Sequence, residues 1–162
     1  MPRLDNQFQV TPSVLDRLID YEPRETREPP RSRSSSIQEL KNAVRRDLEW
    51  LLNTRCYLEA PEHGLEETKK SLAFYGLPDI TGLSAQNPDE QNRLAAALEN
   101  AIRTFEPRFL NLKITMEPPS HTERAIKFRI NAQLDVDPAP EPVMFDTVLE
   151  LGSGDFAVRE VG

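Results

Sequence analysis

The chain has 162 residues, of which 29% are charged and 38% hydrophobic, which is typical of a soluble globular domain with one core. Its formal net charge of −7 argues against general nucleic-acid binding, which needs a basic face. No stretch approaches the roughly 20 apolar residues that span a bilayer, and the first ten residues contain no apolar signal core. We therefore expect a cytoplasmic protein without membrane insertion.

Residues suited to metal or cofactor chemistry are few. Cys56 is the only cysteine, which excludes a disulfide framework, and we expect it to be a small, partly buried residue. His63 and His121 lie in polar stretches far from it, so no zinc-binding spacing is complete. No glycine-rich phosphate loop and no nucleophile elbow occurs. The sequence predicts neither a metal nor a cofactor.

The first 35 residues differ from the rest of the chain. Residues 11–20 are expected to form a short helix, capped by Thr11 with Pro12 in its first turn. Its apolar stripe would dock on its own domain or, alternatively, on a partner; the stripe comprises Val14, Leu15, Leu18 and Ile19. Residues 21–35 are rich in Pro, Arg, Glu and Ser, which predicts a flexible linker.

Three longer helices are predicted next. The first begins with a capping box, Ser36 to Glu39, and continues to Arg55. Its charged side chains should lie on an exposed face: Arg45, Arg46, Asp47 and Glu49. The second covers residues 65–75, with Gly76 as its C-terminal stop. The third covers residues 87–105, with Asn87 as cap and Pro88 as first residue.

After Pro107 the hydrophobic period changes to two, which predicts strands. Strands are expected at 110–116, 126–134, 143–151 and 155–161, the last two joined by a turn at Gly152-Ser153-Gly154. Residues 108–134 carry five bases and two acids, whereas residues 135–162 carry one base and seven acids. We expect these strands to attract each other across the sheet; the alternative is that the charge asymmetry steers a partner. The predicted fold class is α+β: three main helices followed by an antiparallel sheet of about four strands, with residues 36–162 as the folded domain.

Glu106-Pro107-Arg108 stands at the junction between the third helix and the first strand. Pro107 ends the helix and thereby fixes where Glu106 and Arg108 point. These two side chains either form an internal pair that braces the junction or provide a docking site. The residues alone support the two interpretations equally. As an exposed pair they would contribute little stability, so Arg108→Ala should leave folding nearly unchanged. A similar tetrad, Tyr21-Glu22-Pro23-Arg24, starts the linker, and we interpret it as a product of composition.

Several stretches resemble, in order, the TssE family of type VI secretion baseplate subunits, which is similar to a contractile phage tail wedge protein once called a baseplate lysozyme. They are VLDRLIDYEP (14–23), LEWLLNTR (48–55), YGLPDITGLS (75–84), FEPR (105–108) and EPVMFDTVLELGSGDF (141–156). The resemblance implies a non-enzymatic subunit of a baseplate held at the inner membrane.

The same resemblance implies two kinds of partner. Glu106, Pro107 and Arg108, together with Phe105, would contact the helical core bundle of the wedge subunits TssF and TssG. An edge strand, either LNLKITM (110–116) or DFAVREV (155–161), would accept strands from the contractile sheath subunits. The alternative function is a peptidoglycan-cleaving, muramidase-like hydrolase that uses acidic residues, with Glu106 as the best candidate for a general acid. An arginine beside Glu106 would favour its ionised form, which is the wrong form for that role.

Overall fold

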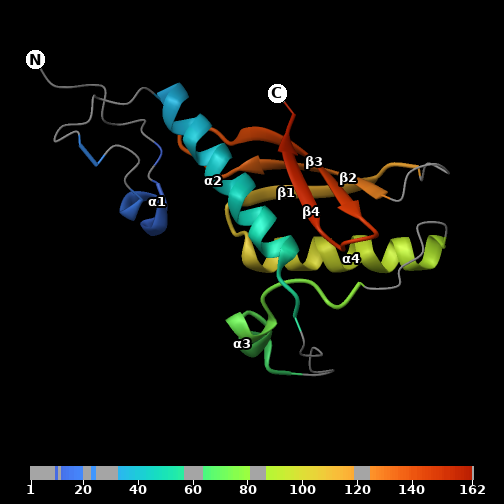
Figure 1. The fold of residues 1–162 in the computed structure, drawn as a ribbon. Coiled ribbons are helices and arrows are strands. Elements are labelled where there is room, and N and C mark those ends of the chain that lie inside the picture. Colours follow the sequence, from blue (N-terminus) through green and yellow to red (C-terminus); the bar gives the residue numbers. More distant parts are fainter. Residues whose placement is uncertain are drawn as a thin grey trace, which may run out of the picture.

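The computed structural model describes residues 10, 12–19, 23–24, 33–56, 64–80, 87–118 and 125–161. Helices precede a four-stranded sheet (Figure 1), so the α+β prediction is confirmed. The elements are α1 (Val14–Leu18), α2 (Arg33–Asn53), α3 (Glu66–Lys69), the 3-10 helix η2 (Leu72–Phe74), α4 (Pro88–Phe105), β1 (Phe109–Met116), β2 (Ala125–Leu134), β3 (Glu141–Glu150) and β4 (Phe156–Glu160). The division at residue 35 into a linker and a domain stays a prediction.

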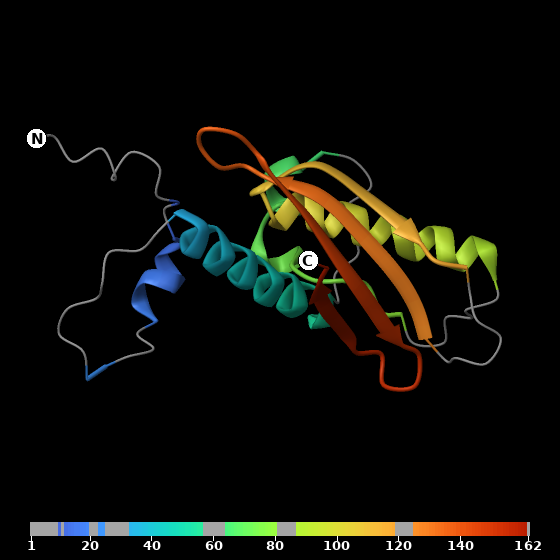
Figure 2. The same cartoon turned by 90° about the horizontal axis from the view of Figure 1, so that it is seen from above.

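The sheet is an antiparallel meander of order β1-β2-β3-β4. Every second residue of β2 is buried, as the period of two predicts, because alternate side chains of a strand point to opposite faces. The buried face packs with α2 and α4 in one hydrophobic core, which includes Leu48, Ile102, Phe128 and Phe145. Helix α4 runs beneath β1, and α2 contacts β4 (Figure 1, Figure 2).

Helix α4 has the predicted start. The side chain of Asn87 accepts a hydrogen bond from the backbone N–H of Asp89 at 3.0 Å, and Pro88 occupies the first turn. Its apolar stripe is buried at Leu94, Leu98 and Ile102. The helix ends at Phe105, directly before the Glu-Pro-Arg junction.

Two other helix starts were predicted wrongly. Helix α2 begins at Arg33, so Ser36 is an inner residue of the helix, 8% exposed, and the predicted capping box does not form. Nothing in Arg33-Ser34-Ser35 stops a helix, and tertiary packing of Ser36 outweighs its preference for a cap. In α1 the cap is Ser13, whose hydroxyl accepts from the N–H of Asp16 at 3.1 Å. Thr11 lies outside the described residues.

The predicted helix 65–75 is split into α3 and η2. Ser71 interrupts it, because its backbone is extended (φ −75°, ψ 160°) and cannot continue α3. Gly76 does not end α3, but it has a left-handed φ of 113°. The next residue, Leu77, donates its N–H to the carbonyl of Thr54 at 2.9 Å. Gly76 therefore lets the chain lie directly against the end of α2.

The predicted attraction between oppositely charged strands is confirmed at one cross-strand pair. Arg129 on β2 lies opposite Asp146 on β3, with Nε and Oδ1 2.8 Å apart. Arg129 also lies 3.4 Å from Glu117. These side chains are about two-fifths exposed, so solvent screens both pairs and they contribute only modestly to stability. In the part of the chain that the structure describes, no helix is long and apolar enough to cross a membrane.

Gly76→Ala is predicted to destabilise the fold. A Cβ at this position would lie 2.5 Å from the backbone oxygen of Thr54, and the positive φ adds strain. We expect the free energy of unfolding to fall by about 2–4 kcal/mol in urea denaturation. Gly152→Ala is the matched control, because a Cβ there meets no atom within 4 Å. Equal stability of the two variants would contradict this account of Gly76.

Candidate functional site

The Glu-Pro-Arg junction is fixed by backbone hydrogen bonds on both sides. The N–H of Glu106 donates to the carbonyl of Ile102 at 2.8 Å and closes the last turn of α4. The carbonyl of Arg108 accepts from the N–H of Asp135 at 2.9 Å, which ties the start of β1 to the end of β2. Pro107 between them cannot continue the helix. The three residues therefore have a defined direction before any partner binds.

Arg108 forms a fork-to-fork ion pair with Glu106. Its Nε donates to Oε1 of Glu106 at 2.6 Å, and its Nη2 donates to Oε2. The same Nη2 also donates to Oδ2 of Asp47 at 2.7 Å. Glu106 is only 5% exposed, whereas the side chain of Arg108 is 26% exposed. Bidentate arginine–carboxylate pairs are among the strongest and most directional contacts in proteins.

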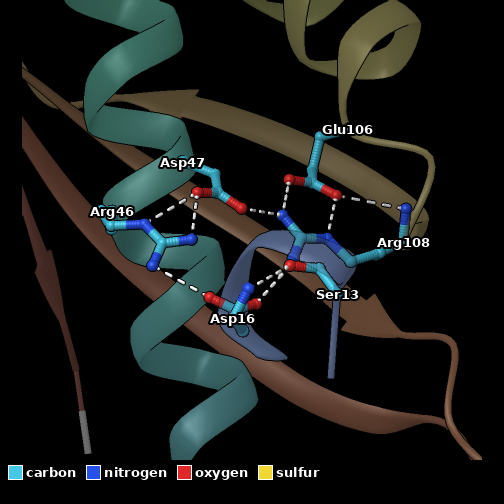
Figure 3. Close-up of polar contacts among 6 residues, drawn as sticks. All are labelled: Ser13, Asp16, Arg46, Asp47, Glu106 and Arg108. Carbon is cyan, nitrogen blue, oxygen red and sulfur yellow. Dashed lines mark hydrogen bonds and ion pairs between the residues drawn. The ribbon is translucent and has the colours of Figure 1, made fainter. Parts of the chain in front are cut away.

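A second arginine extends this pair into a network of five charges (Figure 3). Oδ1 of Asp47 accepts from Arg46 Nε at 3.0 Å and from Nη2 at 2.7 Å. Nη1 of Arg46 lies 2.9 Å from Asp16 of α1, and its guanidinium lies 4.9 Å from the centre of the Trp50 ring. From α1 to the junction the charges alternate: Asp16, Arg46, Asp47, Arg108, Glu106.

The sequence prediction placed Arg46 and Asp47 on an exposed face of α2, and this was wrong. Their side chains are 21% and 25% exposed, because α1 and the junction both lie against this face. The sequence contains only a weak indication that Asp47 is partly buried: it directly precedes Leu48, which is fully buried, so Asp47 borders the buried stripe of α2. Nothing in the local pattern identifies Arg108, 61 residues later, as its partner.

The network sets the charge state of the site. Burial by itself lowers the pKa of Arg108, but the hydrogen bonds and negative charges of Glu106 and Asp47 outweigh burial and raise the pKa. Arg108 therefore stays charged. Burial raises the pKa of the neighbouring Tyr75, and the charges of Asp47 and Glu106 raise it further.

A shallow pocket of about 340 Å³ opens over the junction. Its wall includes Ser13, Asp47, Tyr75, Phe105, Glu106, Pro107 and Arg108. Phe105 is half-buried and meets Tyr75 edge to face, with ring centres 5.2 Å apart. The structure therefore brings all four predicted site residues, Phe105 to Arg108, to the wall of one pocket, and it adds Asp47 and Ser13 to them.

The geometry does not suit the general-acid role that the hydrolase alternative gives Glu106. A general acid must reach the substrate and carry a proton to it. Both carboxylate oxygens of Glu106 instead accept hydrogen bonds from Arg108, and the residue is almost fully buried. Among the described residues, no cluster of His, Cys, Asp and Glu could hold a metal ion. His63, His121 and Glu22 of the second Glu-Pro-Arg lie outside those residues.

Glu106→Gln is predicted to destabilise the fold, because it leaves the charge of Arg108 only half compensated. We expect the free energy of unfolding to fall by about 2–4 kcal/mol, measured by chemical denaturation. Glu99→Gln is the matched control: it breaks an exposed pair with Arg103 on α4 and should cost under about 0.5 kcal/mol. A cost for Glu106→Gln no larger than for Glu99→Gln would mean that the buried pair does not brace the junction.

Comparison with known proteins places the chain in a family. The family model described as baseplate wedge protein gp25 matches residues 38–139, which is more than half of the chain. A chain in a solved structure of the baseplate complex from the type VI secretion system aligns with a TM-score of 0.46 and 19% identity, covering 77% of this chain and 96% of that one. The search of curated proteins found no match. On the family match, this chain belongs to the baseplate wedge protein gp25 family.

Proposed function

We propose that this chain is a non-enzymatic structural subunit of the type VI secretion baseplate wedge. The family match supports a structural role in a baseplate wedge. The ordered motifs shared with the TssE family, FEPR above all, favour a type VI machine. In this proposal the subunit docks on the core bundle formed by TssF and TssG, on the cytoplasmic side of the inner membrane.

The observation that carries the docking proposal is the position of the Arg108 guanidinium. Its Nε and Nη2 are held by Glu106 and Asp47, whereas Nη1 makes no hydrogen bond to any residue that the structure describes. The side chain is partly exposed beside the pocket. A preformed arginine loses little rotamer entropy when a partner binds. Nη1 suits a carboxylate, or the free carbonyls at the end of a partner helix.

An edge strand that accepts sheath strands is the second part of the proposal. β1 and β4 are the two edges of the sheet. On β4, the N–H and the carbonyl of Phe156 are both bonded by the side chain of Asn53 at 2.8 and 2.9 Å, so α2 occupies that end. On β1, the pairing with β2 is irregular between Leu110 and Lys113, and Asn111 is left-handed (φ 53°). Because the Asn53 contact occupies one end of β4 and the irregular pairing disturbs one end of β1, a sheath strand could add only along the remaining part of either edge strand.

Arg108→Lys is predicted to weaken binding to purified TssF–TssG at least about tenfold, because lysine keeps the charge but loses the fork. Arg108→Ala should weaken it further. The burial of Glu106 changes the expectation from the sequence, since Arg108→Ala also leaves a buried carboxylate unpaired and should destabilise the fold. Binding by biolayer interferometry should therefore be measured at a temperature where circular dichroism shows every variant folded.

Arg103→Lys is the matched control for this docking test. Arg103 lies on α4, five residues before Arg108, and its side chain is 64% exposed in a pair with Glu99. Normal binding by Arg108→Lys and Arg108→Ala would leave Glu106-Pro107-Arg108 as an internal brace only. Peptidoglycan turnover by the purified protein, lost in Glu106→Gln, would instead support the hydrolase alternative.

Hydrogen exchange should identify the edge that receives the sheath strand. The N–H of Glu117 donates to Lys127 and that of Val161 donates to Met144, so the alternating amides of Ile114 and Met116 in β1, and of Val158 and Glu160 in β4, point away from the sheet. We expect sheath subunits to slow exchange in the peptide that contains one of these pairs by about tenfold or more. Unchanged exchange in both peptides, with sheath bound, would contradict strand addition.

A further inference from the structure

Helix α1 lies outside the residues that the family model matches, yet it adjoins the proposed docking site. The close-up in Figure 3 shows it beside the junction, with Ser13 and Asp16 directed toward the charge network. Its apolar side chains are exposed: Val14 by 68%, Leu15 by 43% and Leu18 by 77%. The helix buries none of its residues. The helix itself therefore meets the chain through polar contacts, while the apolar contacts of this segment come from its flanks, where Val10 packs on the core and the C-cap Ile19 is half-buried.

This arrangement is the reverse of the usual one. An amphipathic helix that serves only its own domain turns its apolar stripe to the core and its charges to water. Here Asp16 points inward and pairs with Arg46 at 2.9 Å, and the hydroxyl of Ser13 donates to Asp16 at 2.6 Å. A helix that merely covered the junction would bury its apolar residues there. The inverted orientation instead leaves Val14 and Leu18 exposed.

The pocket over the junction links α1 to the docking site. Ser13, the cap of α1, lines the same pocket as Arg108 and Glu106. A partner that reaches Arg108 through this pocket therefore touches the start of α1. The charge network gives a second link, because Arg46 contacts Asp16 on one side and Asp47, the partner of Arg108, on the other.

We propose that α1 is a second docking element of this subunit: the helical partner that accepts a hydrogen bond from Arg108 also packs on the outward stripe of Val14 and Leu18. The proposal rests on the proposed function, since it assigns more of the surface of the same partner. The surface that covers α1 is helical and carries apolar side chains next to a carboxylate or a free helix carbonyl. Asp16 and Arg46 are positioning residues that hold α1 beside Arg108.

The test measures the affinity of the full chain for the purified TssF–TssG complex by biolayer interferometry. The double variant Val14→Ser/Leu18→Ser should bind roughly tenfold more weakly, because buried apolar side chains at an interface carry much of its affinity. Its thermal midpoint should equal that of the unmodified chain, since both side chains are exposed. Leu72→Ser is the matched control: Leu72 is 85% exposed on η2, and the variant should bind normally.

A second pair of variants tests the link through the charge network. Asp16→Asn keeps the shape of the side chain but removes the charge that pairs with Arg46, and it should weaken binding several-fold. Glu49→Gln is the matched control. Glu49 lies on the same face of α2, and its carboxylate pairs only with Arg45 among the described residues, so this variant should bind normally. In a double-mutant cycle, the effects of Asp16→Asn and Arg108→Lys should be non-additive.

The outcomes separate this inference from the proposed function. If the unmodified chain does not bind TssF–TssG, the proposed function fails. If it binds but Arg108→Lys and Arg108→Ala bind normally, only docking through Glu106-Pro107-Arg108 fails. The inference fails in both cases. If Arg108→Lys weakens binding but Val14→Ser/Leu18→Ser does not, only the role of α1 is overturned. A change of oligomeric state in sedimentation for the α1 variant, with normal wedge binding, would assign the stripe to a second copy of the chain instead.

Discussion

The carboxylate of Glu106 is nearly buried, and the site depends on how that charge is neutralised. An unpaired carboxylate in this position would cost several kcal/mol, so the chain must place a cation beside it. Arg108 does this from two residues away, and Pro107, which has no backbone N–H, stands between them. The pair thus fixes the angle at which the last turn of α4 leads into β1. Buried ion pairs often add specificity of geometry more than stability, and this position suits such a role.

Asp47 spreads this constraint to the helix layer. It comes from α2, and it holds the guanidinium at 2.7 Å while its other oxygen binds Arg46. Because Arg46 also holds Asp16, one polar chain connects α1, α2 and the end of α4 on the surface beside β1. A shift of any of these helices would lengthen at least one hydrogen bond. The pocket therefore has walls that are set by elements distant in sequence, as a preorganised docking site requires.

The sequence predicted those parts of the molecule whose causes are local. The cap at Asn87, the stop at Pro107 and the alternation in β2 depend on neighbours within a few residues, and each lies where the pattern placed it. Glu106 and Arg108 could be selected because a proline fixes both directions. Asp47 could not, because its burial depends on elements that lie far from it in sequence. The same reason explains Ser36: its local preference for a cap is weaker than the packing of the helix that contains it.

The two Glu-Pro-Arg triplets of the sequence differ in their surroundings where the structure describes them. Pro23 and Arg24 lie in an exposed turn, where a proline fixes its own backbone angle, and Arg24 has no hydrogen bond or ion pair with another residue that the structure describes. At Pro107 the preceding N–H closes a helix and the carbonyl of Arg108 is bound by the end of a strand. The backbone on both sides is then rigid, so the arginine can meet Glu106 and Asp47 with little further loss of entropy. An arginine ordered in this way can offer its remaining nitrogen to a partner, whereas an arginine in an exposed turn would have to be ordered by the partner itself.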